Sequence, residues 1–226
     1  MTDLSLLHMV PLAIPLVGLV AAIVIPNRFP LIRRRLYVSI LGLTLVALAV
    51  TWLAPANAAR LAAWSDVSLY GETLAFRVDG LGRALGLLLS ASLCAVGLSM
   101  WWQPMERYEC VSLLGLIAAS IGALTADNLL TLCAMFAAQD LAGLGFAIVK
   151  AADENLPHAQ RNVFTNLLAT IALVGATLLM GAQQRQVELA AHSLQGLPVA
   201  LLMISALLRL NIYPGPGSLK RRWEAL

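Results

Sequence analysis

The segment that decides the fold reads Leu197-Pro-Val-Ala-Leu-Leu-Met-Ile-Ser-Ala-Leu-Leu-Arg209-Leu-Asn211-Ile-Tyr213, and Pro214 follows it. It is an apolar run long enough for a helix, with one cation inside it and a helix-breaking residue directly after it. A cation inside an apolar membrane span is costly and usually marks a partner or an ion path. The only acid inside another long apolar segment is Asp140, so function depends on whether these two charges meet.

Composition places the chain in a membrane. Of its 226 residues, 60% are hydrophobic and 12% are charged, and the mean hydropathy is +0.81. Soluble domains carry about 25% charged residues. The formal net charge of +3 does not indicate nucleic-acid binding, because the basic residues flank apolar runs instead of clustering on one solvated face. We therefore expect an all-α integral membrane protein with no nucleic-acid partner.

Seven segments match the length of about 20 apolar residues that spans a bilayer: 4–25, 36–54, 80–101, 109–126, 128–149, 161–181 and 197–213. Ten basic residues lie beside these spans on one side: Arg28, Arg33, Arg34, Arg35, Arg107, Lys150, Arg161, Lys220, Arg221 and Arg222. Four lie on the other side: Arg60, Arg77, Arg83 and Arg185. The positive-inside rule then places the N-terminus outside and the C-terminus inside.

The chain is expected to form one membrane domain over residues 1–226, because no long linker or low-complexity tract divides it. Its first part, 1–101, holds three helices and an outer hairpin within 60–78. The spans of 109–213 form the second part, and 214–226 is a short cytoplasmic tail.

Two local features lie on the predicted outer side. Alternating residues at 67–70 and 73–76, around a turn at Gly71-Glu72, predict the two strands of the hairpin. Asp79 and Arg83 stand four residues apart where the third span begins, and the acid suits the positive end of the helix dipole. We interpret this pair as structural.

Nothing in the sequence indicates catalysis by this chain alone. Cys94, Cys110 and Cys133 lie in or beside apolar segments without metal-ligand spacing, so we interpret them as small packing residues. The sequence has no glycine-rich phosphate loop, metal-ligand cluster or nucleophile triad. We expect no enzymatic activity, cofactor or metal.

The depths of the two buried charges favour a direct pair. Asp140 lies thirteen residues after Asp127, and Arg209 lies twelve after the first residue of its span, which places them about 20 and 18 Å along parallel helices. Opposite charges at one depth in an apolar bundle are expected to pair, since either alone is costly. Asn166 and Asn211 could satisfy their remaining hydrogen-bonding groups. In the alternative, Arg209 extends to the inner boundary and Asp140 faces a partner subunit.

Four stretches resemble the motifs of one membrane-protein family. F-R-V-D-G-L at 76–81 resembles F-x-x-D-G-L, and D-N-L-L-T-L at 127–132 resembles D-[DN]-L-L-x-L. Q-D-L-A-G-L at 139–144 resembles W-E-L-x-G-L, and R-L-N-I-Y-P at 209–214 resembles K-S-A-Q-F-P. These motifs belong to the antiporter-like membrane subunits of respiratory complex I, Mrp-type cation/proton antiporters and membrane-bound hydrogenases. The resemblance covers roughly residues 60–215.

The resemblance implies a fold and a site. The family joins two inverted five-helix repeats, each with a broken helix, so 109–213 resembles a partial repeat broken at Pro214, and the chain resembles the first half of the fold. The family's channel glutamate and its partner lysine correspond to Asp140 and Arg209. Three extra residues precede the acid, however, and an ungapped alignment places Ala137 in the glutamate position.

The change from lysine to arginine alters what such a pair can do. A desolvated lysine can change its protonation state and pass a proton along, whereas an arginine stays charged in proteins. Asp140 and Arg209 therefore favour a fixed structural pair over a proton relay. An arginine can still guide ions electrostatically, so the sequence alone does not exclude transport.

Three functions remain open at this point. The first is an accessory or scaffold subunit of a proton- or sodium-coupled membrane complex. The second is an active ion-translocating subunit completed by a partner chain, for example in an inorganic-carbon uptake complex. The third, a free-standing membrane protein, is disfavoured because a broken helix needs cover for its backbone groups. The resemblance implies a multi-pass protein of a bacterial-type inner membrane, whose partners are lipid and other membrane subunits, including a full-length antiporter-like homologue.

Overall fold

The computed structural model describes residues 9–26, 28–53, 61–63, 74–76, 80–99, 101–150, 156–182 and 196–209. These residues form seven helices: α2 (Val10–Val24), α3 (Pro30–Leu53), α4 (Gly80–Ser99), α5 (Arg107–Leu124), α6 (Leu129–Lys150), α7 (Leu156–Ala182) and α8 (Leu197–Arg209). Two short strands, β1 (Leu61–Ala63) and β2 (Leu74–Phe76), complete the described part. The predicted all-α membrane fold is confirmed.

Five of the seven helices, α3 to α7, are long and apolar enough to cross a membrane. The other two, α2 and α8, are apolar but shorter over the residues that the structure describes. The predicted start of the second span needs correction, because α3 begins at Pro30 and not near residue 36, although its end at Leu53 agrees with the prediction. Proline at a helix start is favourable, since its missing N–H would have no partner there.

The three arginines expected in a loop before α3 therefore lie in its first two turns. Arg33 and Arg34 are buried, and the Nε of Arg33 donates a hydrogen bond of 3.1 Å to the carbonyl of Met105 before α5. Arg107 donates to the carbonyl of Ile23 in the last turn of α2. Cations suit this negative end of a helix. The arginines thus tie together the ends of α2, α3 and α5.

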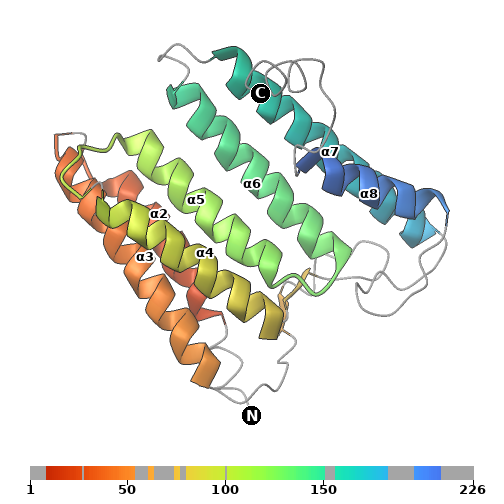
Figure 1. Ribbon diagram of the computed structural model, residues 1–226, viewed down its shortest axis with the longest axis horizontal. Helices are drawn as coiled ribbons and strands as arrows, with labels where there is room; N and C mark the ends of the chain where they lie inside the picture. The colour runs from red at the N-terminus through yellow and green to blue at the C-terminus, as the bar shows by residue number, and fades with distance from the viewer. Residues whose placement is uncertain are drawn as a thin grey trace, which may run out of the picture.

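The helices form two groups joined by one helix. In Figure 1, α2 to α5 lie together at one side, α7 and α8 lie together at the other, and α6 runs between them. The first group packs around a core from α2, α3 and α5 that includes Leu41, Leu114 and Ile121. On its other side α6 packs against α7 around Cys133 and Leu173. The position of α8 relative to the first group therefore depends on α6.

The predicted hairpin pairing is wrong. The ladder lies within 60–78, but β2 pairs antiparallel with β1, with Leu61 opposite Phe76, and not with residues 67–70 across a tight turn. The second edge of β2 is also occupied, since the amide of Asp127 donates to the carbonyl of Ala75 at 3.0 Å. Both edges of β2 therefore have other partners, and the expected partner at 67–70 lies outside the described residues.

This strand is anchored to the start of α6. The side-chain Oδ1 of Asn128 accepts hydrogen bonds from the backbone amide of Thr131 at 2.9 Å and from its hydroxyl at 2.7 Å, which caps the helix. The same hydroxyl accepts a bond of 2.8 Å from the amide of Ala75 in β2. The stretch at 127–132 thus fixes where α6 begins and, through it, the level of Asp140.

The predicted orientation can be tested by labelling single cysteines. In a protein whose Cys94, Cys110 and Cys133 are replaced by alanine, Arg28→Cys should react with an impermeant maleimide only from the inner side. Asn57→Cys should react only from the outer side, because the loop charges place the two positions across the membrane. Labelling of both from the same side of sealed vesicles would contradict the predicted topology.

Candidate functional site

The candidate site is a charge pair between α6 and α8. Arg209 donates from Nη1 to Oδ1 of Asp140 at 3.2 Å and from Nη2 to Oδ2 at 3.1 Å. This is the bidentate fork that a planar guanidinium forms with a carboxylate. The two side chains retain only 15% and 10% of their exposure, respectively. The structure thus brings together the two charges that the sequence placed at one depth.

A third helix completes the contact through Thr170. Its hydroxyl donates to Oδ2 of Asp140 and accepts from Nη2 of Arg209, so α6, α7 and α8 meet at one point. Thr170 could not be singled out from the sequence, because α7 carries three threonines and nothing in the sequence says which of them faces Asp140. Asn166, which was predicted, lies one turn earlier on α7 and is half-buried. Among the described residues, Thr170 and not Asn166 hydrogen-bonds the pair.

An aromatic ring covers the cation. The Cζ atom of Arg209 lies 3.8 Å from the centroid of Phe136, which stands one turn before Asp140 on α6. Such a contact is worth about 0.5–2 kcal/mol, more when it is desolvated. The Nε of Arg209 is buried and has no hydrogen-bond partner in the described part of the chain. The ring therefore supplies a favourable contact where the guanidinium lacks a polar one.

An apolar cluster lies on α6 and α7 between the ion pair and the start of α6, where α6 contacts β2. The Cys133 sulfur and the Thr177 hydroxyl are 3.3 Å apart, two turns beyond the level of Asp140 and Thr170. Around this contact pack Leu129, Cys133, Leu173 and Met180, with Leu132, Phe136 and Leu202 against them. The site is therefore an ion pair with an apolar cluster on that side.

No protein-family model and no curated protein matches the sequence. A solved structure does match the fold: a chain of the membrane-bound sulfane sulfur reductase, an archaeal respiratory membrane complex. The TM-score is 0.72 at 15% identity, and the match covers 88% of this chain and 33% of that chain. This chain shares the fold of a respiratory-complex membrane protein. It spans about one third of the length of the protein it matches.

The structure also separates the two positions proposed for the family's glutamate. Ala137 is exposed on α6, whereas Asp140, three residues later, points to Arg209. Three residues are close to one helical turn, so the two positions lie about 4.5 Å apart along the helix. By contact with the cation, Asp140 is the acid of this site.

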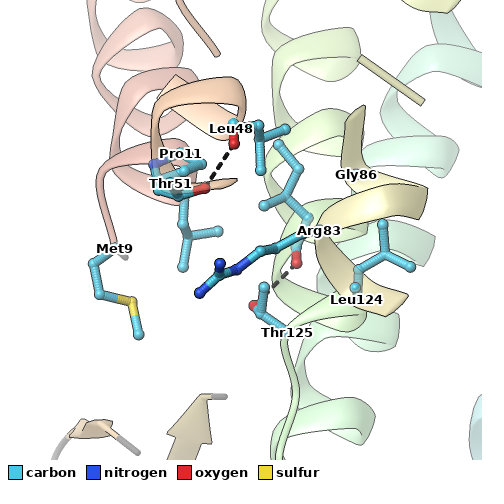
Figure 2. A pocket seen from close by; sticks show the side chains of 11 residues that line it. Met9, Pro11, Leu48, Thr51, Arg83, Gly86, Leu124 and Thr125 are labelled. Atoms are coloured by element: carbon cyan, nitrogen blue, oxygen red, sulfur yellow. Dashed lines mark hydrogen bonds between the residues drawn. The ribbon is translucent and has the colours of Figure 1, made fainter. Parts of the chain in front are cut away.

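The predicted structural residues fall partly within the described range. Arg83 is buried near the start of α4, and Figure 2 shows its side chain reaching toward Met9 at the start of α2. It lines a cavity of about 10 Å³ with Thr51 of α3 and Thr125 after α5. Its predicted partner Asp79 lies outside the described residues.

Other predictions also fall outside the described residues: Asn211, Pro214 and the tail 214–226. The three cysteines are free, Cys110 and Cys133 are buried, and Cys94 is half-buried. Within the described ranges, no three His, Cys, Asp or Glu side chains gather as a metal site would require.

Removing one charge of the pair should lower the free energy of unfolding more than removing both charges. Asp140→Ala leaves the guanidinium of Arg209 without its carboxylate in an apolar bundle, and we expect a loss on the order of 3–5 kcal/mol of unfolding free energy. Asp140→Leu combined with Arg209→Leu should be milder, because no unpaired charge remains. Unfolding in mild detergent measures both, and Glu106→Ala at an exposed carboxylate serves as the control. A double variant less stable than Asp140→Ala would contradict the pairing.

Thr170→Val tests whether the hydroxyl holds the pair. The change keeps the shape of the side chain and removes two hydrogen bonds to charged groups, each worth about 1.5–3 kcal/mol. Thr177→Val is a matched control on the same helix, since Thr177 is equally buried and bonds neutral groups. We expect Thr170→Val to lower the unfolding midpoint clearly more than the control. Equal losses would show that the bridge to the charges adds nothing.

Proposed function

We propose that this chain is an accessory or scaffold membrane subunit of a proton- or sodium-coupled multisubunit complex. The observation that carries the proposal is the clamp on Arg209, which Asp140, Thr170 and Phe136 hold from two other helices. In this role the pair fixes α8 against α6 and α7 and does not exchange protons.

The chemistry of arginine supports a fixed pair. A guanidinium does not release its proton in proteins, whereas a lysine ammonium does so when it is desolvated. The two parallel hydrogen bonds to Asp140 and the ring of Phe136 both use the planar shape of the guanidinium. A lysine would keep neither geometry. The site is therefore suited to holding helices together.

The large exposed share of α6 supports contact between this helix and a partner subunit. Of the five long apolar helices, α6 has the smallest buried share, 17% against 28–44% for the others. Leu141, directly after Asp140, is 71% exposed. A charge pair that retains some exposure in the middle of a bilayer is costly unless protein or water covers it. We infer that another membrane subunit, a full-length antiporter-like homologue, packs beside Asp140.

The similarity to a chain of an archaeal respiratory membrane complex is consistent with this role. The proposal adds that the chain is non-catalytic by itself and sits as a multi-pass protein in a bacterial-type inner membrane. Its partners are then membrane subunits and lipid.

One observation favours the alternative, an active ion-translocating subunit completed by a partner chain. Polar side chains recur along α7 at Asn166, Thr170 and Thr177, and such a file could line a path in an ion-coupled complex, including one for inorganic-carbon uptake. Leu173, buried between Thr170 and Thr177, interrupts the file. This interruption and the permanent charge of Arg209 favour the scaffold role.

Photo-crosslinking from two exposed helix faces tests whether another membrane subunit packs against α6. A photoreactive amino acid at Leu141 on α6 should form a crosslink to another membrane protein in native membranes. The matched position is Val46 on α3, which is also exposed and should crosslink only to lipid. Mass spectrometry should identify the protein captured at Leu141 as an antiporter-like subunit with a lysine–glutamate pair. A chain that purifies alone and forms no protein crosslink at Leu141 would contradict the proposal.

A further inference from the structure

The start of α3 combines exposed cations with an apolar stripe beyond them. Arg28 and Arg35 are both exposed. Arg28 lies in the turn two residues before α3, and Arg35 lies on an exposed face of the helix in its second turn. The same face continues with Leu43 and Val46, which are 55% and 59% exposed. The face is thus cationic at its first turns and apolar beyond them.

The other arginines at this end, of which Arg33 and Arg34 are buried and Arg107 is half-buried, have their own partners within the fold. Arg33 donates to the carbonyls of Met105 and Pro26, and Arg107 donates to that of Ile23. The guanidinium of Arg34 lies over the ring of Tyr37 at 5.6 Å. Arg28, whose guanidinium lies over the ring of Phe29 at 4.9 Å, and Arg35 are both exposed, so a group outside the chain can reach their charges.

Aromatic side chains mark the same level as the membrane interface. The amide of Met105 donates to the carbonyl of Pro30, which holds the segment before α5 level with the start of α3. Trp102 and Tyr108, three residues to either side of Met105, are 76% and 67% exposed. Exposed Trp and Tyr sit at the headgroup region of a bilayer. The exposed arginines therefore lie at headgroup depth.

The distance from Arg35 to Val46 matches the thickness of one leaflet. Val46 follows Arg35 by eleven residues, about 16 Å along the helix. Half of a hydrocarbon core of about 30 Å is about 15 Å. A phospholipid whose phosphate meets Arg35 can therefore lay an acyl chain along Leu43 and Val46.

We propose that Arg28, in the turn before α3, and the face of α3 formed by Arg35, Leu43 and Val46 together bind one anionic phospholipid of the adjacent leaflet. The two guanidinium groups bind the phosphate, a geometry for which arginine is well suited. Two glutamates, Glu106 and Glu109, lie at this end beside Met105, against five arginines at 28, 33–35 and 107, so the local charge favours an anion. The site is independent of the Asp140–Arg209 pair.

Native mass spectrometry of the full chain in detergent tests the proposal, with phosphatidylglycerol and phosphatidylcholine of identical acyl chains as probes. The wild type should bind phosphatidylglycerol in preference to phosphatidylcholine. Arg28→Gln with Arg35→Gln should weaken that binding by roughly 30-fold, since each basic residue near the membrane surface contributes about fivefold. Arg28→Lys with Arg35→Lys should retain most of the preference. Soluble glycerol phosphate should not displace the lipid, because it lacks the chain that packs on Val46.

The control variant removes two positive charges from the C-terminal tail. Lys220→Gln with Arg221→Gln changes the net charge of the chain by the same amount and should leave the preference for phosphatidylglycerol intact. The proposal is overturned if the wild type shows no preference, if glutamine at 28 and 35 leaves binding unchanged, or if the tail control loses as much as the glutamine variant.

Discussion

An arginine inside a bilayer keeps its charge. The fold must therefore provide a partner for Arg209 in the last turn of α8. Asp140 provides the partner, Thr170 joins both groups, and Phe136 covers the cation. These contacts come from α6 and α7, while α8 itself packs chiefly on α7. A shift of any of the three helices would separate charges that are costly to leave apart. The pair therefore sets the mutual positions of α6, α7 and α8.

The first half of the chain sets the depth at which that pair can form. Asn128 caps α6, and Thr131 binds the backbone of β2, so the start of α6 is fixed against a strand from another part of the sequence. From that start, twelve residues of helix carry Asp140 about 18 Å into the apolar layer. At the opposite end of the bundle, Arg33 and Arg107 fix the ends of α2, α3 and α5 by binding backbone carbonyls.

Apolar run length was sufficient to predict the helices, and equal depth was sufficient to suggest that Asp140 and Arg209 meet. Thr170 and Phe136 could not be found in this way, because hydroxyl and aromatic residues are common in membrane helices and their contacts depend on helix rotation. The start of α3 was missed because Arg33 was counted with the basic residues between two spans, whereas it lies in the helix and is buried against a carbonyl. The pairing of β1 with β2 was missed because a local turn pattern says nothing about a partner farther along the chain.

The central claim is that the pair holds helices and does not carry protons. The most direct test is ion-coupled transport by membranes whose complex contains the Asp140→Leu, Arg209→Leu variant, with the rate normalised to the amount of assembled complex. A fixed pair predicts that each assembled complex transports at the wild-type rate, because the pair takes no part in moving protons. A complex that assembles in normal amount yet transports nothing would contradict the account and identify the pair as part of a working ion path.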